Sequence, residues 1–123
     1  KAAVKQGGTI IVASGLREGV GSPDFAGIIS ETRDLEAFMR RINTGGFYRN
    51  DQWQFEEFAL VARRAEVMLC SDGLPREAQG RLFVTPVESV EAGLALAFRK
   101  HGPAARVLAL PHGPYVVPVV RRA

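Results

Sequence analysis

Cysteine and histidine are scarce in this chain, whose 123 residues include one cysteine and two histidines. Because Cys70 has no second cysteine to pair with, an internal disulfide is excluded, and a reducing, cytoplasmic location is expected. The thiol stands inside the apolar run of residues 67–70, where we expect it to be inert. With His101 and His112 as the only histidines and no Cys-x-x-Cys pair, the chain lacks the ligand cluster of an intrinsic metal site.

Long hydrophobic runs and strong charge of one sign are also missing. No apolar run approaches the roughly 20 residues that a membrane-spanning helix needs, and the net charge is only +3. The basic residues do not gather into the patch typical of nucleic-acid-binding proteins. They occur as pairs near expected helix or chain ends, where cations favour the helix dipole: Arg40-Arg41, Arg63-Arg64, Arg99-Lys100 and Arg121-Arg122. We therefore expect one globular domain over residues 1–123, with neither nucleic acid nor a membrane as partner.

The first eight residues resemble the end of a helix rather than its beginning. Lysines followed by Gly7-Gly8 are typical of a helix exit, because glycine accepts the left-handed conformation and cations favour the negative end of the dipole. No initiator methionine or helix start precedes Lys1. We therefore expect a domain excised from a larger protein, whose amino-terminal segments, including any targeting signal, lie outside this sequence.

Hydrophobic patterns predict strands that alternate with helices. Apolar runs bounded by glycine or polar residues indicate buried strands at residues 9–13, 67–70 and 106–110. Helices are expected to begin after the caps Ser22 and Asp34, and within two capping boxes, residues 51–54 and residues 85–88, the second with Pro86 at its first helical position. Residues 115–120 are expected to be extended, and Pro118 restricts them to a sheet edge or to positions outside a ladder.

Strands of this kind, apolar throughout and separated by helices, indicate a mostly parallel sheet with helices on both faces. The predicted fold is α/β, a three-layer Rossmann-like sandwich. Ligands of such sheets gather beyond the carboxyl ends of the strands. The loops that follow the three predicted strands would bring Arg17, Glu18, Asp72 and His112 to one rim of the sheet. Of these four, Arg17, Asp72 and His112 are candidates for lining a cleft.

The glycine-rich loop of residues 15–21 allows two interpretations. It follows a strand and precedes a helix, the position where backbone amides can hold an anion. Its spacing matches neither the dinucleotide fingerprint nor the phosphate loop, which favours a structural role. His112, between Pro111 and Gly113, is likewise either a ligand or a loop residue hydrogen-bonded to backbone.

Trp53 occupies the first turn of its predicted helix, off the apolar stripe that includes Phe55 and Phe58. It can pack as a staple against the preceding Phe47-Tyr48 segment. Alternatively, it can supply a cleft with an apolar wall and one N–H donor, which suits a site that excludes water.

Five motifs carry a resemblance to a known family: residues 7–12 (GGTIIV), 17–22 (REGVGS), 51–54 (DQWQ), Ser71-Asp72, and Leu110-Pro111-His112-Gly113 through Pro118. Their order resembles the carboxyl-terminal domain of nickel-dependent lactate racemases and related 2-hydroxy acid epimerases, and the resemblance covers nearly the whole chain. The individual motifs are not specific, so the ordered set carries the resemblance.

The resemblance implies a parent isomerase that inverts 2-hydroxy acids with a nickel-pincer nucleotide derived from nicotinic acid. In that family a pyridinium carbon of the cofactor accepts hydride from the substrate, while a histidine takes the hydroxyl proton. The residues that hold cofactor and nickel and the catalytic histidines belong to the amino-terminal domain, and no motif here matches them. Catalytic, cofactor-binding and metal-binding residues are therefore not expected in this chain.

Of the family's active-site residues, only the tryptophan that lines the substrate cleft carries over, onto Trp53. The resemblance thus implies a domain that closes the cleft over the cofactor held by the amino-terminal domain and places Trp53 against a small 2-hydroxy acid. The identity of that acid and the activity of this chain alone stay open. The alternatives are a stand-alone nucleotide- or anion-binding module and a structural module without catalysis.

Overall fold

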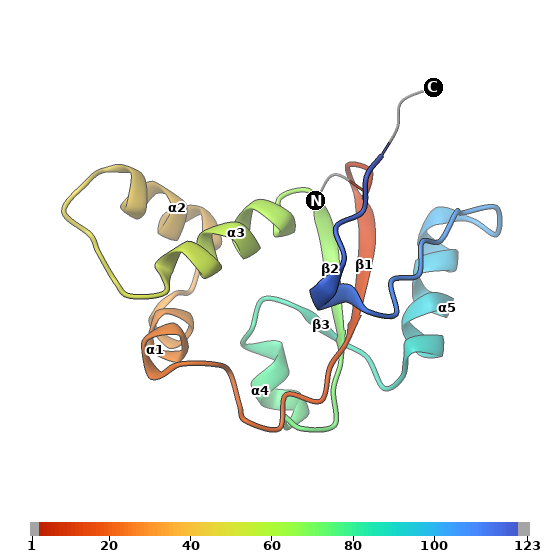
Figure 1. Ribbon diagram of the computed structural model, residues 1–123, viewed down its shortest axis with the longest axis horizontal. Helices are drawn as coiled ribbons and strands as arrows, with labels where there is room; N and C mark the ends of the chain where they lie inside the picture. The colour runs from red at the N-terminus through yellow and green to blue at the C-terminus, as the bar shows by residue number, and fades with distance from the viewer. Residues whose placement is uncertain (1–2, 121–123) are drawn as a thin grey trace.

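Three parallel strands form the sheet of this protein, for which a computed structural model describes residues 3–120 (Figure 1). The strand order is β1 (Gly8–Ala13), β2 (Ala65–Cys70) and β3 (Thr85–Pro86). Gly8 of β1 pairs with Ala65 and Ala13 pairs with Cys70, so β1 and β2 run in register along their whole length. The predicted α/β class and the first two predicted strands are confirmed.

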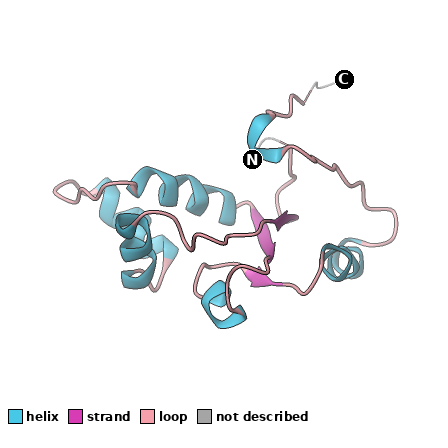
Figure 2. Cartoon of the chain, turned by 60° about the horizontal axis from the view of Figure 1, so that its bottom comes forward, coloured by secondary structure: helices cyan, strands magenta, loops and turns pink. Residues whose placement is uncertain are grey.

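Helices lie on both sides of this sheet. They are α1 (Pro23–Glu31), α2 (Leu35–Asn43), α3 (Gln52–Ala62), α4 (Arg76–Gly80) and α5 (Val90–His101), followed by the 3-10 turn η1 (Gly113–Tyr115). In Figure 2 the α1–α3 group lies on one side of the strands and α5 on the other. Helix α3 packs against β2, and α5 packs against β1 and β2.

The main core lies among α1, α2 and α3. Phe55 is 1% exposed and is surrounded by other aromatic rings, the nearest being Phe38, whose centroid is 4.7 Å away. Ile28 of α1, Met39 of α2 and Ala59 of α3 complete the buried cluster. The predicted apolar stripes of these helices therefore face one another.

Local capping explains the starts of α1 and α2. Ser22 caps α1 by accepting a hydrogen bond from the Phe25 amide at 3.1 Å, and Asp34 caps α2 by accepting one from Glu36 at 2.8 Å. Both predictions are confirmed. The capping box predicted after Thr85 is wrong, because residues 85–86 form β3 and α5 begins later, with Ser89 accepting from the Ala92 amide at 3.1 Å.

The strand predicted at residues 106–110 is wrong. These residues form no ladder, and their apolar side chains are exposed, with Leu108 at 60%. A strand needs a paired neighbour and covered side chains, and this segment has neither within the described part of the chain. The predicted helix end at residues 1–6 lies partly outside the described residues; residues 3–7 form turns, and Gly7 has the expected positive φ of 73°.

Candidate functional site

The segment of residues 48–54 turns at Asn50 and Asp51 and places Trp53 in the first turn of α3. Asp51 has a left-handed backbone with a φ of 62°. Its carboxylate accepts a hydrogen bond from the Gln54 side chain at 3.1 Å, and the Gln52 side chain accepts one from the Arg49 amide at 2.8 Å. The capping box predicted here is wrong, because the Asp51 side chain caps no backbone amide of α3. The helix start itself is confirmed.

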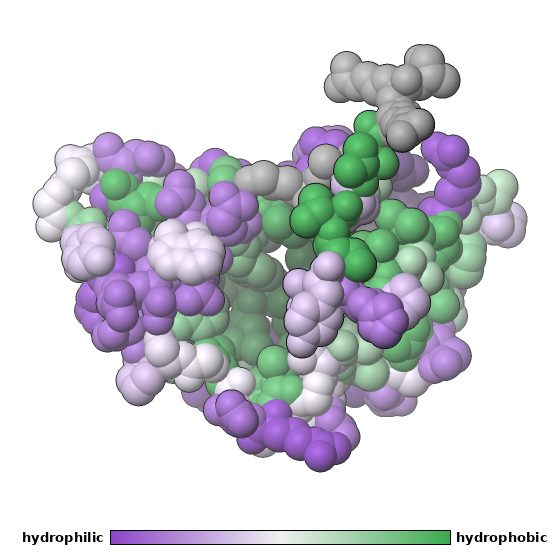
Figure 3. All heavy atoms as spheres, in the orientation of Figure 1, coloured by the Kyte–Doolittle hydropathy of each residue, from purple (hydrophilic) through white to green (hydrophobic). Residues whose placement is uncertain are grey.

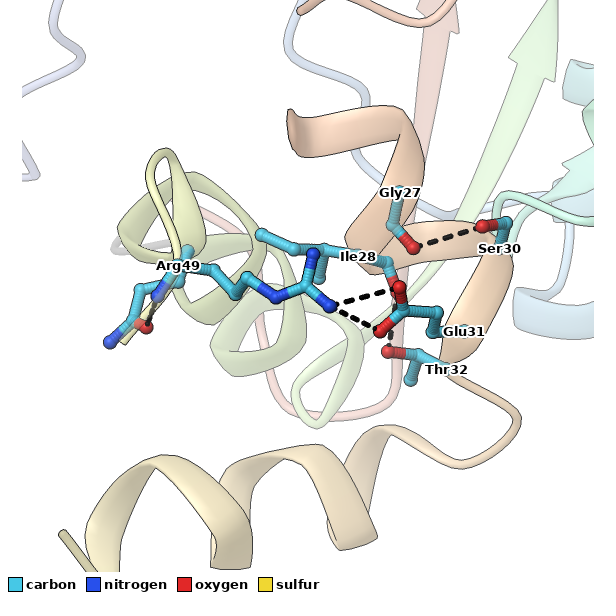
Figure 4. Close-up of polar contacts among 7 residues, drawn as sticks. Gly27, Ile28, Ser30, Glu31, Thr32 and Arg49 are labelled. Atoms are coloured by element: carbon cyan, nitrogen blue, oxygen red, sulfur yellow. Dashed lines mark hydrogen bonds and ion pairs between the residues drawn. The ribbon is translucent and has the colours of Figure 1, made fainter. Parts of the chain in front are cut away.

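The same turn is tied to α1 by side chains. Nη2 of Arg49 lies 2.9 and 2.8 Å from the two carboxylate oxygens of Glu31 (Figure 4). The Ser22 hydroxyl, which caps α1, donates to the Asp51 carboxylate at 2.5 Å. These contacts join residues that are 18 and 29 positions apart in the sequence. They fix the turn at both ends of α1 and therefore restrict the orientation of the first turn of α3.

Trp53 is presented to solvent by this anchored turn. Its side chain is 64% exposed, and that of Tyr48 is 82% exposed. The staple interpretation is wrong, because Phe47 instead packs edge-on against Phe38 and lies beneath the Arg41 guanidinium at 4.1 Å. An indole held on an anchored turn but left uncovered offers an apolar face and one N–H donor to a neighbouring domain.

A second cluster lies at the carboxyl ends of β1 and β2. The Ser14 amide donates to the Cys70 carbonyl at 3.0 Å, which brings the loops after the two strands together. Arg17 and Asp72 then approach to 4.0 Å, with both side chains more than three-quarters exposed. The prediction that these two side chains meet at one rim is confirmed by this distance.

The rim surrounds an open depression of about 350 Å³, which is lined by Ala13, Ser14, Gly15, Cys70, Ser71, Asp72 and Glu88. Its polar groups are hydroxyls and carboxylates, and Arg76 pairs with Glu88 at 3.3 Å. Such a lining favours hydrogen-bond donors and disfavours anions. The glycine loop ends at the start of α1, where two carboxylates already lie: Asp24 is in the first turn of α1, and Asp51 accepts a hydrogen bond from the cap Ser22. Their negative charge disfavours binding of an anion there.

The two histidines lie apart. His112 is the N-cap of η1 in the carboxyl-terminal segment. The strand expected to lead it to the rim is absent at residues 106–110, and its approach to Asp72 stays a prediction. His101 ends α5, and its Nε2 lies 2.8 Å from the Thr9 hydroxyl of β1. Within residues 3–120 no three His, Cys, Asp or Glu side chains are grouped so that they could hold a metal ion. Over the same residues, no helix has the length and apolarity to cross a membrane.

A family model for the lactate racemase C-terminal domain matches residues 1–119. The chain belongs to the lactate racemase C-terminal domain family. It is 28% identical over 111 residues to the lactate racemase of Lactiplantibacillus plantarum, covering 89% of this chain and 26% of that protein. It is also 28% identical over 99 residues to the lactate racemase of Thermoanaerobacterium thermosaccharolyticum, covering 79% of this chain and 23% of that protein.

The fold agrees with this assignment. The structure of the lactate racemase apoprotein from Thermoanaerobacterium thermosaccharolyticum matches with a TM-score of 0.72 and 27% sequence identity, over 83% of this chain and 25% of that one. The chain thus spans about a quarter of the length of the curated relatives it matches. The family resemblance deduced from the ordered motifs is confirmed.

Sequence reasoning singled out Trp53 but missed the residues that position it. Arg49 and Glu31 gave no motif, and Ser22 was recognised only as a helix cap, because their partners in these contacts are far away in the sequence. The spacing of Asp51 and Gln54 was a usable signal, since it marks a turn with interacting side chains. Its interpretation as a capping box predicted that the Asp51 carboxylate binds a backbone amide of α3, whereas it accepts a hydrogen bond from the Gln54 side chain.

Proposed function

We propose that this chain is the carboxyl-terminal domain of a two-domain racemase or epimerase of 2-hydroxy acids. It closes the active-site cleft over a nickel-pincer cofactor held by the amino-terminal domain, and Trp53 forms one wall of the substrate site. Membership in the lactate racemase family supports the reaction class. The single structural observation that carries the role of Trp53 is its 64% exposure on a turn anchored to α1.

The chemistry assigned to each domain follows from the donor groups that this chain offers. Its described residues contain no group of side chains that could hold nickel, and His101 is engaged with Thr9. What Trp53 can supply is different. An indole wall displaces water from the substrate, and its N–H can donate to one oxygen of a 2-hydroxy acid. A drier site strengthens every electrostatic interaction with the developing charge.

The test of Trp53 is a Trp53→Ala variant of the full-length parent. We expect kcat/KM for racemisation to fall by about ten- to a hundredfold, consistent with the loss of one positioning contact. Folding should be little affected, because the side chain is mostly exposed. Tyr48→Ala is the matched control, since it removes a still more exposed aromatic side chain from the same turn. Unchanged kinetics for Trp53→Ala would reject the role.

The two-domain architecture has its own test, the intact mass of the native polypeptide under denaturing conditions. A mass several times the 13.4 kDa of this chain supports a parent with a separate cofactor domain and leads directly to a nickel and racemisation assay. A mass equal to that of this chain would remove the catalytic domain and reject the proposal. A cytoplasmic location, expected from the single cysteine, is part of the same proposal.

A further inference from the structure

Exposed apolar side chains are concentrated in residues 107–120, which we call the C-terminal arm. Of the exposed large hydrophobic side chains in the described residues, eight lie in the arm: Val107, Leu108, Leu110, Tyr115, Val116, Val117, Val119 and Val120. Tyr115 and Val117 are 89% and 88% exposed. Figure 3 shows hydrophobic surface along the arm on the facing side of the molecule. The arm also contains no Asp, Glu, Lys or Arg. An uncharged apolar segment of this length marks a contact surface.

The backbone of the arm limits how it can bind. In Figure 2 the arm runs outside the layers formed by the helices and the sheet. Its prolines Pro111, Pro114 and Pro118 lack N–H donors, and the short turn η1 interrupts it, with the Tyr115 amide donating to the His112 carbonyl at 2.8 Å. Prolines at these positions disfavour a continuous ladder with another strand. The arm is therefore suited to lie extended in an apolar groove, where its side chains supply the contacts.

We propose that the arm is a strap between domains, which docks in an apolar groove on the cofactor-holding domain of the same polypeptide. The family model extends through residue 119, so the arm is part of the domain rather than an unrelated tail. About three-quarters of the length of the matched relatives lies outside the matched region, which leaves ample chain to form the groove. This inference rests on the two-domain parent of the proposed function.

The charged residues next to the arm in the sequence indicate a further property of the surface that would bind it. Arg106 immediately precedes the arm, and Arg121-Arg122 immediately follow it, so an uncharged apolar stretch is bounded by cations in the sequence. A groove that is apolar along its floor and acidic at its two ends complements this pattern. Because the arm continues from α5, which packs on the sheet, docking would tether the domain that carries Trp53 to its partner and limit how far the cleft opens.

The experiment is photo-crosslinking in the full-length parent, with a photoreactive amino acid at position 117. The control carries it at position 90, where Val90 is an exposed apolar residue of α5 outside the arm. We expect position 117 to cross-link within one molecule to a peptide that precedes Lys1, with a yield well above that of the control. A cross-link to residues 3–120, for instance to the edge of β1, would overturn the proposal.

The remaining outcomes are also decisive. A cross-link between two molecules would make a second copy the occupant and overturn the proposal, as would no cross-link above the control. The result is independent of the kinetics of Trp53→Ala, since it reports contact rather than turnover. A parent that racemises its substrate but gives no interdomain cross-link would reject the strap alone. A native mass equal to that of this chain would reject the proposed function as well.

Discussion

Arg49 and Glu31 form an ion pair that joins the turn before α3 to the last turn of α1. The Arg49 nitrogen Nη2 lies 2.9 and 2.8 Å from the two oxygens of Glu31, while the Arg49 amide donates to Gln52. The two side chains are 39% and 52% exposed, so the pair adds only about 0.2–1 kcal/mol to stability. Its importance is geometric, because it restricts the turn that presents Trp53.

We therefore expect Arg49→Met to loosen Trp53 without unfolding the domain. Trp53 is the single tryptophan of this chain, so its fluorescence anisotropy decay reports the motion of this side chain directly. The decay should become faster, while the far-ultraviolet circular dichroism stays unchanged. Arg81→Met is the matched control, because it removes a similar exposed ion pair, at 2.9 Å, between Glu77 of α4 and the C-cap Arg81. An equal change in both variants would contradict a positioning role for Arg49.

Gly73 is the residue that lets the two rim loops approach each other. A Cβ atom at this position would lie 1.7 Å from the Gly15 carbonyl oxygen and 2.8 Å from the Arg17 amide nitrogen. Both neighbours are backbone atoms, so the loops must separate to accept any side chain. We expect Gly73→Ala to destabilise the protein by about 1–3 kcal/mol, the cost of overpacking a close contact.

The measurement is urea denaturation, and Gly27→Ala is the control. A Cβ at Gly27, within α1, would meet nothing within 4 Å, and alanine favours a helix over glycine by up to about 1 kcal/mol. Gly73→Ala should therefore lower the free energy of unfolding, and Gly27→Ala should raise it. If Gly73→Ala were as stable as the original chain, the close approach of the rim loops would be refuted.

The sequence predicted the parts of the fold that local chemistry determines. Ser22 and Asp34 cap the helices expected of them, because a capping side chain needs a partner only two or three residues away. The strands β1 and β2 were recognisable because both are largely apolar runs next to glycine or polar residues, and α5 packs on both of them. The meeting of Arg17 and Asp72 followed from the rule that parallel strands end at the same edge.

Features that depend on partners distant in the sequence were not predictable in the same way. Residues 106–110 have the composition of a strand, but a strand forms only where a neighbour pairs with it and another layer covers it. The two-residue strand β3 was hidden for the opposite reason, because its pairing with Met68 and Leu69 depends on the position of β2 rather than on its own sequence. Asp51 acts through Ser22, which is 29 residues away.

Glu66 connects the sheet to α5 and gives the protein a defined response to acid. Its carboxylate lies 2.8 Å from the Lys100 ammonium and accepts a hydrogen bond from the Thr85 hydroxyl at 3.2 Å. The hydrogen bond from Lys100 is the main cause that holds the pKa of Glu66 below its usual value of 4.5; the charge of Lys100, Thr85 and nearby His101 act in the same direction. A lowered folded pKa means that the ionised form stabilises the fold.

We expect Glu66→Gln to lower the free energy of unfolding by about 0.5–1 kcal/mol near neutral pH, since the pair is partly exposed. The stabilisation by ionised Glu66 is fully present above the pKa that Glu66 has in the unfolded chain, and it is lost as the pH falls through its lower pKa in the folded protein. Denaturation of both proteins from neutral pH to about pH 3 should therefore give curves that converge in acid. Glu77→Gln, which removes a carboxylate that pairs four residues away with the C-cap of α4, Arg81, should cost less at neutral pH. A difference for Glu66→Gln that stayed constant down to the lowest pH would show that the charge of Glu66 does not stabilise the fold.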